Sequence, residues 1–148
     1  PGNVSAETIM EAVADSARFD VLQLGEAAMK GQTARALRIL ECLRGEGMEP
    51  PVVLWALNKD LQWMARAQAL MHAGQSADSA MNALYVWRPR QAAMRQALHR
   101  LAPDTLRDLL LDAERVDRAI KGVLRTDPWV EFEALVARFA GAQLGRAA

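Results

Sequence analysis

Residues 50–72 constrain the fold most strongly, because they carry two apolar stripes at helical spacing. Pro50 and Pro51 suit the first turn of a helix, where a missing N–H has no partner to lose, and Gly74 is expected to end the helix. A helix that is apolar on two flanks is packed against on two sides, so we expect this one near the middle of a bundle. The first stripe is Leu54, Leu57, Leu61, Met64 and Met71, and the second is Val52, Ala56, Trp63, Ala67 and Leu70.

Trp55 is the exception on this helix. It falls on the narrow polar side, together with Asn58, Gln62 and Arg66. A large indole in such a place is either covered by another segment or contacts a partner.

The rest of the chain predicts further helices joined by short loops, and no window of four or more residues alternates like a strand. A chain of 148 residues is long enough to bury one core. We therefore predict an all-α fold, a compact bundle of about seven to eight helices. The further helices are expected near residues 5–14, 20–29, 36–43, 76–85, 94–101 and 106–124, and from Pro128 to Phe139, with a break near Arg88-Pro89.

Composition excludes several classes of protein. Hydrophobic residues make up 51% of the chain without any run of eighteen, which indicates a soluble, folded protein with no membrane span. Eighteen basic residues balance eighteen acidic ones, so the net charge gives no general attraction to nucleic acid or lipid. The single Cys42 fits a reducing compartment, and its place in an apolar helix predicts a buried, inert thiol. The start at Pro1, without an initiator Met, suggests a piece of a longer protein.

No catalytic or cofactor motif is evident. His72 and His99 have no second ligand at metal-binding spacing, and the phosphate-binding patterns GxxxxGK[ST] and GxGxxG are absent from the sequence. We expect no catalytic residue, cofactor or metal in this chain, and hence no enzymatic activity of its own.

Asp117 falls inside the apolar stripe of the predicted helix 106–124. A buried carboxylate is costly unless it is paired, so Asp117 needs a donor. Lys121, one turn later, is the local candidate, and an indole N–H or a helix N-terminus is the alternative. The pair is interpreted as a structural buried polar contact, with a functional role as the other reading.

A basic stretch follows Trp87. It contains Arg88, Arg90, Arg95 and Arg100, and residues 84–102 include no acidic residue. Such a stretch forms a solvated basic face, or an interface with an acidic partner or with a nucleic acid backbone. Trp63 and Trp129 are expected in the core, whereas Trp55 and Trp87 lie beside polar residues and suit either the core or an interface.

Three runs of the chain, in fixed order, carry a family resemblance. They are LGEAAMKGQTARALRILECLRGEGMEPPVVLWALNKDLQWMARA, VWRPRQAAMRQALHRL and LLLDAERVDRAIKGVLRTDPWVEFEALV. Together they resemble the C-terminal domain of bacterial DNA polymerase III delta subunits, over residues 4–140 or so. Asp117, Ile120, Lys121 and Gly122 stand at that family's "D..iKg" element.

The resemblance implies a non-catalytic part of the clamp loader, which places the sliding clamp on primed DNA and belongs to a DNA-directed DNA polymerase holoenzyme. Residues 1–17 resemble the last helix of the lid domain, and residues 18–148 the helical collar that joins the subunits of the pentamer. The implied partners are the ATPase subunits and a delta-prime-like subunit, in the bacterial cytoplasm at the replisome. Sliding-clamp binding belongs to an N-terminal domain that this sequence lacks, and DNA is met indirectly through the complex.

We predict that Trp55 or Trp87, with some of Arg88, Arg90 and Arg95, contacts neighbouring subunits. Two alternatives stay open at this point. One is a general helical protein-interaction module, and the other is a domain that binds the DNA backbone through Arg88–Arg100.

Overall fold

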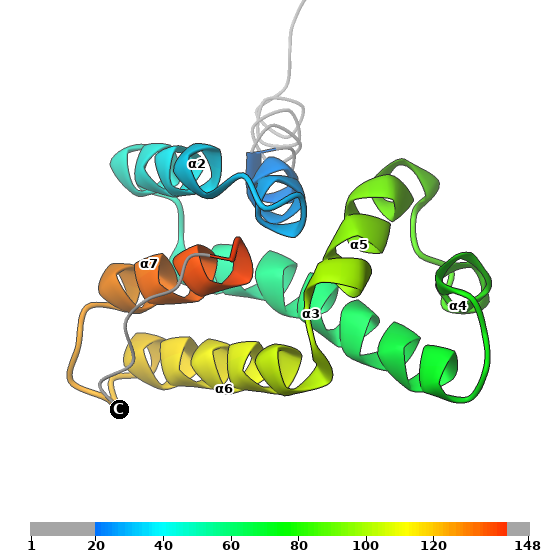
Figure 1. Ribbon diagram of the computed structural model, residues 1–148. Helices are drawn as coiled ribbons and strands as arrows, with labels where there is room; N and C mark the ends of the chain where they lie inside the picture. The colour runs from blue at the N-terminus through cyan, green and yellow to red at the C-terminus, as the bar shows by residue number, and fades with distance from the viewer. Residues whose placement is uncertain (1–19, 142–148) are drawn as a thin grey trace, which may run out of the picture.

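The computed structural model describes residues 20–141, and this part of the chain is entirely helical (Figure 1). It contains seven helical segments and no strand, which confirms the predicted all-α class. The helix predicted at residues 5–14 and the lid segment 1–17 lie outside the described residues. The segments are residues 20–29, α2 (Thr33–Gly45), α3 (Pro50–His72), α4 (Ala77–Ala83), α5 (Arg88–Arg100), α6 (Pro103–Ile120) and α7 (Pro128–Phe139).

Helix α3 is the central element, as its two apolar stripes predict. It packs against α4, α5 and α6, while α7 packs on α6 and α2. In Figure 1, α3 crosses the molecule, and α4 and α5 lie beside its C-terminal half. The two stripes meet on one broad face of α3, which buries Leu57, Leu61 and Met64 completely.

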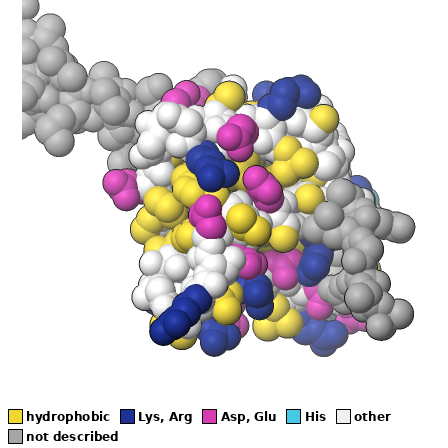
Figure 2. All heavy atoms as spheres, turned by 90° about the vertical axis from the view of Figure 1, so that its left-hand side faces the viewer, with side chains coloured by type: hydrophobic (Ala, Val, Ile, Leu, Met, Phe, Trp, Pro, Cys, Tyr) yellow, Lys and Arg dark blue, Asp and Glu magenta, His cyan; other side chains and the backbone are white. Residues whose placement is uncertain are grey.

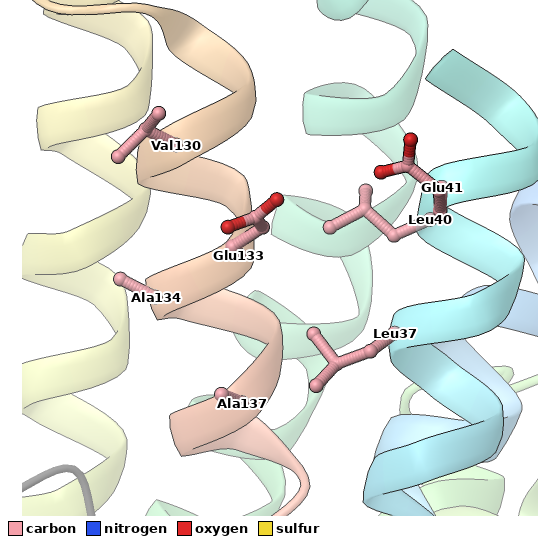
Figure 3. A pocket seen from close by; sticks show the side chains of 7 residues that line it. All are labelled: Leu37, Leu40, Glu41, Val130, Glu133, Ala134 and Ala137. Atoms are coloured by element: carbon pink, nitrogen blue, oxygen red, sulfur yellow. The ribbon is translucent and has the colours of Figure 1, made fainter. Parts of the chain in front are cut away.

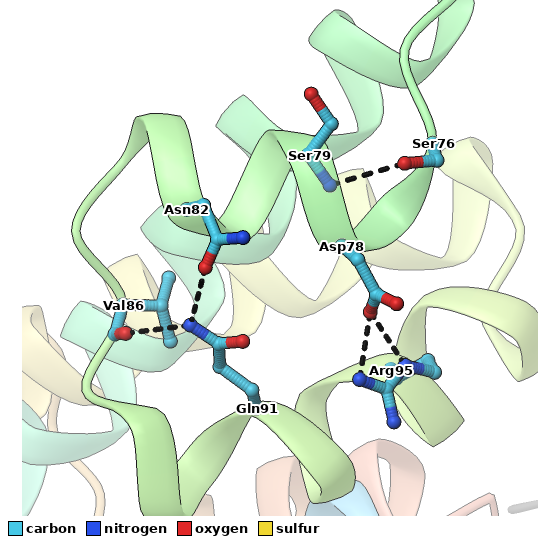
Figure 4. Close-up of polar contacts among 7 residues, drawn as sticks. All are labelled: Ser76, Asp78, Ser79, Asn82, Val86, Gln91 and Arg95. Atoms are coloured by element: carbon cyan, nitrogen blue, oxygen red, sulfur yellow. Dashed lines mark hydrogen bonds and ion pairs between the residues drawn. The ribbon is translucent and has the colours of Figure 1, made fainter.

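Helix α5 begins earlier than the sequence predicts, at Arg88 instead of near Met94. Pro89 fits the first turn of this helix because a proline there has no intrahelical N–H bond to lose, and Trp87 occupies the N-cap position without a side-chain cap hydrogen bond. Side chains then tie α5 to α4 (Figure 4). Gln91 Nε2 donates to Asn82 Oδ1 at 3.1 Å, and Arg95 pairs with Asp78 at 2.7 Å.

Arg100 joins the two ends of the described chain. Its Nη2 donates to the carbonyl oxygens of Ala28 and Phe139, both at 3.0 Å. These carbonyls stand at the ends of helix 20–29 and of α7, where the last C=O groups of a helix have no intrahelical donor. Gly31 and Gly141 follow the two helices with positive φ angles, and both lie against the Arg100 side chain. One guanidinium therefore stabilises two helix C-termini.

Two sequence-based expectations about burial are wrong. Asp117 does pair with Lys121, with 2.8 Å between Oδ2 and Nζ, but the two side chains are 40% and 65% exposed. Helix α6 ends at Ile120 because Gly122 takes a left-handed conformation, so the predicted stripe does not continue to Leu124. Cys42 is also exposed, because it lies on the outer side of α2.

Candidate interaction surface

Three tryptophans gather at one place on the molecule. Trp55 and Trp63 come from α3, and Trp87 stands at the N-cap position of α5; together with residues 21 and 22 they line a pocket of about 320 Å³. Trp55 and Trp87 are 57% and 59% exposed, whereas Trp63 is half-buried against the core. We call the surface formed by Trp55, Lys59, Trp63 and Trp87 the tryptophan surface.

Lys59 lies between two of these rings. Its Nζ is 5.1 Å from the centroid of Trp55 and 5.0 Å from that of Trp63. Positions 55, 59 and 63 are four residues apart on α3, so the three side chains stack on one face of the helix. An ammonium within about 6 Å of an indole face is attracted by the ring quadrupole, and this attraction orders the surface.

A buried ion pair forms the floor of the pocket. Asp60 of α3 and Arg90 of α5 bond directly, and each side chain is 4% exposed. Arg90 Nη1 also donates to the Leu22 carbonyl at 2.8 Å, which joins helix 20–29 to the pair. Burial raises the pKa of Asp60 to about 6, and the charge of Arg90 opposes this shift without overcoming it.

Gly25 makes room for this pair. A Cβ at position 25 would collide with the Asp60 carboxylate and lie 2.8 Å from Arg90 Nη2. The absence of a side chain at Gly25 therefore lets helix 20–29 pack directly over the two charged groups.

The expectation that Arg90 belongs to an exposed basic face is wrong, because its side chain is buried and forms an ion pair with Asp60. Arg95 pairs with Asp78, and Arg100 binds carbonyl groups at two helix ends. Arg88 follows Trp87 directly, is exposed and is engaged in none of these contacts. The structure thus brings Trp55 and Trp87 to one pocket, with Arg88 next to it, and places Arg95 on the neighbouring α4–α5 contact.

Sequence reasoning missed Asp60, although a signal was present. In helical projection Asp60 falls between the two apolar stripes of α3, which is the middle of the buried face. A carboxylate in that position requires a basic partner from another helix.

The described residues indicate neither a metal site nor a membrane-spanning helix. Between residues 20 and 141, His, Cys, Asp and Glu side chains form no group of three or more that could hold a metal ion. No helix in the same range is long and apolar enough to span a bilayer.

A family model described as the C-terminal part of the processivity clamp loader gamma complex of DNA polymerase III matches residues 22–145. The chain belongs to this family. The matched range contains all seven described helices except the first two residues of helix 20–29, and therefore also the whole tryptophan surface.

Relatives of this clamp-loader family member are delta subunits. The Escherichia coli (strain K12) DNA polymerase III subunit delta is 31% identical over 138 residues, which are 90% of this chain and 39% of that protein. The delta subunit of Haemophilus influenzae is 23% identical over 137 residues, covering 86% of the chain and 39% of the relative. The chain thus spans about two fifths of the length of these relatives.

A solved structure shares the fold. The Bacillus subtilis DNA clamp loader delta protein superposes with a TM-score of 0.66 at 14% identity, over 93% of this chain and 40% of that one. At this identity the likeness establishes the helical architecture alone. It agrees with the all-α fold of the clamp-loader family member described here.

Proposed function

We propose that this chain is the collar region of a clamp-loader delta subunit. In this role residues 18–148 hold the subunit to its neighbours in the pentamer, residues 1–17 form the last helix of the lid, and the region has no catalytic activity of its own. The partners would be the ATPase subunits and a delta-prime-like subunit of a cytoplasmic replication complex. Through that complex the chain would support loading of the sliding clamp onto primed DNA.

The tryptophan surface is the observation that supports this proposal best. Two indoles that are more than half exposed stand around a pocket, on a scaffold held rigid by a buried ion pair. Tryptophan and arginine are the residues most often found as binding anchors in protein interfaces. Family membership supplies the kind of partner, because the relatives are named as subunits of a multi-subunit polymerase.

The proposal is tested by measuring assembly with the purified ATPase subunits. Replacing Trp55 or Trp87 with alanine should weaken the association about thirtyfold or more, which is the usual effect of losing an interface anchor. Arg88→Ala and Arg95→Ala should have smaller effects, since charges at the rim contribute less. Both tryptophan variants should keep the helical circular dichroism spectrum of the wild type, because the two rings are largely exposed.

Leu111→Ala is the matched control. Leu111 is exposed to a similar extent on α6, away from the pocket, so its truncation should leave assembly unchanged. Normal assembly of both tryptophan variants would contradict the assigned surface. The DNA-backbone alternative makes a different prediction, a steep loss of DNA affinity with rising salt, whereas a collar region should bind DNA weakly at all salt concentrations.

A further inference from the structure

A second hollow lies away from the tryptophan surface. It is a groove of about 540 Å³ between α2 and α7, which we call the α2–α7 groove (Figure 3). Figure 2 shows the end of the molecule to which α2, α6 and α7 contribute, where Asp and Glu side chains lie between hydrophobic ones and beside several Lys and Arg side chains. The groove and the tryptophan surface share no lining residue. The groove is lined by Leu37, Leu40, Glu41, Val130, Glu133, Ala134 and Ala137.

Five of the seven side chains that line the groove are apolar. Leu37 and Leu40 point from α2 toward α7, and Glu133 extends from α7 into the space between the two helices (Figure 3). Ala134 and Ala137 complete the lining on α7 with short side chains. Val130 at one end is 53% exposed. Leu40 and Ala137 are buried and form the floor, so the hollow has an apolar floor and a volume in the range of sites that take up side chains of a ligand or partner.

Two carboxylates stand at the rim of the groove. Glu41 on α2 and Glu133 on α7 are both exposed, and no hydrogen bond or ion pair joins either carboxylate to another residue within 20–141. Other acidic groups of this region are engaged, since Glu131 pairs with Arg115 and Asp127 lies 3.7 Å from Arg44. The groove therefore combines an apolar floor with negative charge from both walls that the described fold does not neutralise.

We infer that the α2–α7 groove is a docking site for a helical segment of a partner protein, with apolar residues along one side and Lys or Arg flanking them. A groove between two helices accepts the apolar face of a third, whose anchors recur at three- and four-residue spacing. Glu41 and Glu133 then select a basic helix, because like charges facing them are unfavourable. Their charge also disfavours nucleic acid and anionic lipid, which carry the same sign.

This site is independent of the proposed collar role, which rests on the tryptophan surface. Loss of one should leave the other intact, so Trp87→Ala should not change binding in the groove. Likewise, changes in the groove should leave assembly with the ATPase subunits unaffected.

The probe is a labelled synthetic helix with Leu at every third or fourth position and Lys along both flanks, titrated onto the protein by fluorescence anisotropy. A second peptide with Glu in place of Lys is the charge-reversed partner. Wild-type protein should bind the Lys peptide at least about tenfold more tightly than the Glu peptide. The double variant Glu41→Lys/Glu133→Lys should reverse that preference.

Glu46→Lys/Glu114→Lys is the matched control, because it changes the net charge equally at exposed positions outside the groove. It should retain the wild-type preference to within about threefold. Ala134→Trp fills the groove and should abolish binding of both peptides, with circular dichroism used to verify the fold.

Equal affinity for the two peptides, or an unchanged preference in the Glu41→Lys/Glu133→Lys variant, would overturn the inference. Sedimentation equilibrium of the protein alone tests whether a second copy of the chain occupies the groove instead. If the wild type forms dimers that Glu41→Lys/Glu133→Lys dissociates, the groove is filled by a second copy and the partner-helix assignment is wrong.

Discussion

The two ion pairs Asp60–Arg90 and Asp117–Lys121 show how differently the same chemistry acts in two regions of this molecule. Asp60 and Arg90 come from helices α3 and α5 and lie in the core beneath the tryptophan surface. Asp117 and Lys121 lie one turn apart at the end of α6, and both side chains are in contact with water. A buried charge that loses its partner is expensive, whereas an exposed pair at i, i+4 spacing is worth only a few tenths of a kcal/mol. Position in the fold therefore decides which pair controls stability.

Breaking the buried pair should have the largest effect. Asp60→Ala leaves the Arg90 guanidinium buried without its counter-charge, so we expect a loss of about 3–5 kcal/mol in the free energy of unfolding. Urea denaturation followed by circular dichroism measures this loss. Such a change is a large part of the total stability of a domain of this size.

Replacing both partners separates charge from packing. Asp60→Leu/Arg90→Leu removes the two charges together, and apolar pairs of similar volume are often as stable as the ion pair they replace. This double variant should therefore recover most of the stability that Asp60→Ala loses. Equal destabilisation of the two variants would mean that the geometry of the pair, and not its charge, holds α3 to α5.

The pH dependence of stability should carry the signature of Asp60. Its pKa is raised by burial from 3.8 to about 6, so between these values the folded protein binds a proton that the unfolded chain releases. This proton uptake adds roughly 1–3 kcal/mol to the free energy of unfolding. The added stability is fully present below about pH 4 and is lost as the pH rises through about 6. Unfolding measured from pH 4 to 7 should show this fall relative to Asp60→Leu/Arg90→Leu, which lacks the titrating group. A parallel pH profile for the two proteins would show that Arg90 fully offsets the effect of burial.

A methyl group at position 25 should disturb the same region by crowding. Gly25→Ala places a Cβ against the Asp60 carboxylate and Arg90, and overpacking of a tight contact costs about 1–3 kcal/mol. Gly45→Ala is the control, because a Cβ there meets no atom within 4 Å. Thermal unfolding should therefore distinguish two substitutions that are chemically identical.

The exposed pair should give the smallest effect. Asp117→Ala removes the bond to Lys121, and we expect a change of about 0.5 kcal/mol or less, reduced further at high salt. Denaturation at two salt concentrations tests this. A loss of several kcal/mol would mean that Asp117 has a structural role that its exposure does not indicate.

The helices could be predicted because local rules determine them. The prolines that open α3 and α7 and the glycines that follow helix 20–29 and α3 act within a few residues. The burial of single charges could not be predicted in the same way. Whether Asp60 or Asp117 enters the core depends on which distant helix covers it, and Arg90 stands thirty residues away from its partner.

The tryptophan surface was only partly accessible from the sequence. Polar neighbours set Trp55 and Trp87 apart from the core residues, and both are indeed more than half exposed. That they meet at one pocket follows from the packing of α5 beside α3, which no local pattern specifies. No sequence pattern indicated the α2–α7 groove, because the alanines that line it are ordinary helix-forming residues.

The contacts of Arg100 give the bundle a mechanical link between segments far apart in the chain. A shift of helix 20–29 would therefore act directly on α7 through a single side chain. Tension on helix 20–29 would thus reach the helix that forms one wall of the α2–α7 groove.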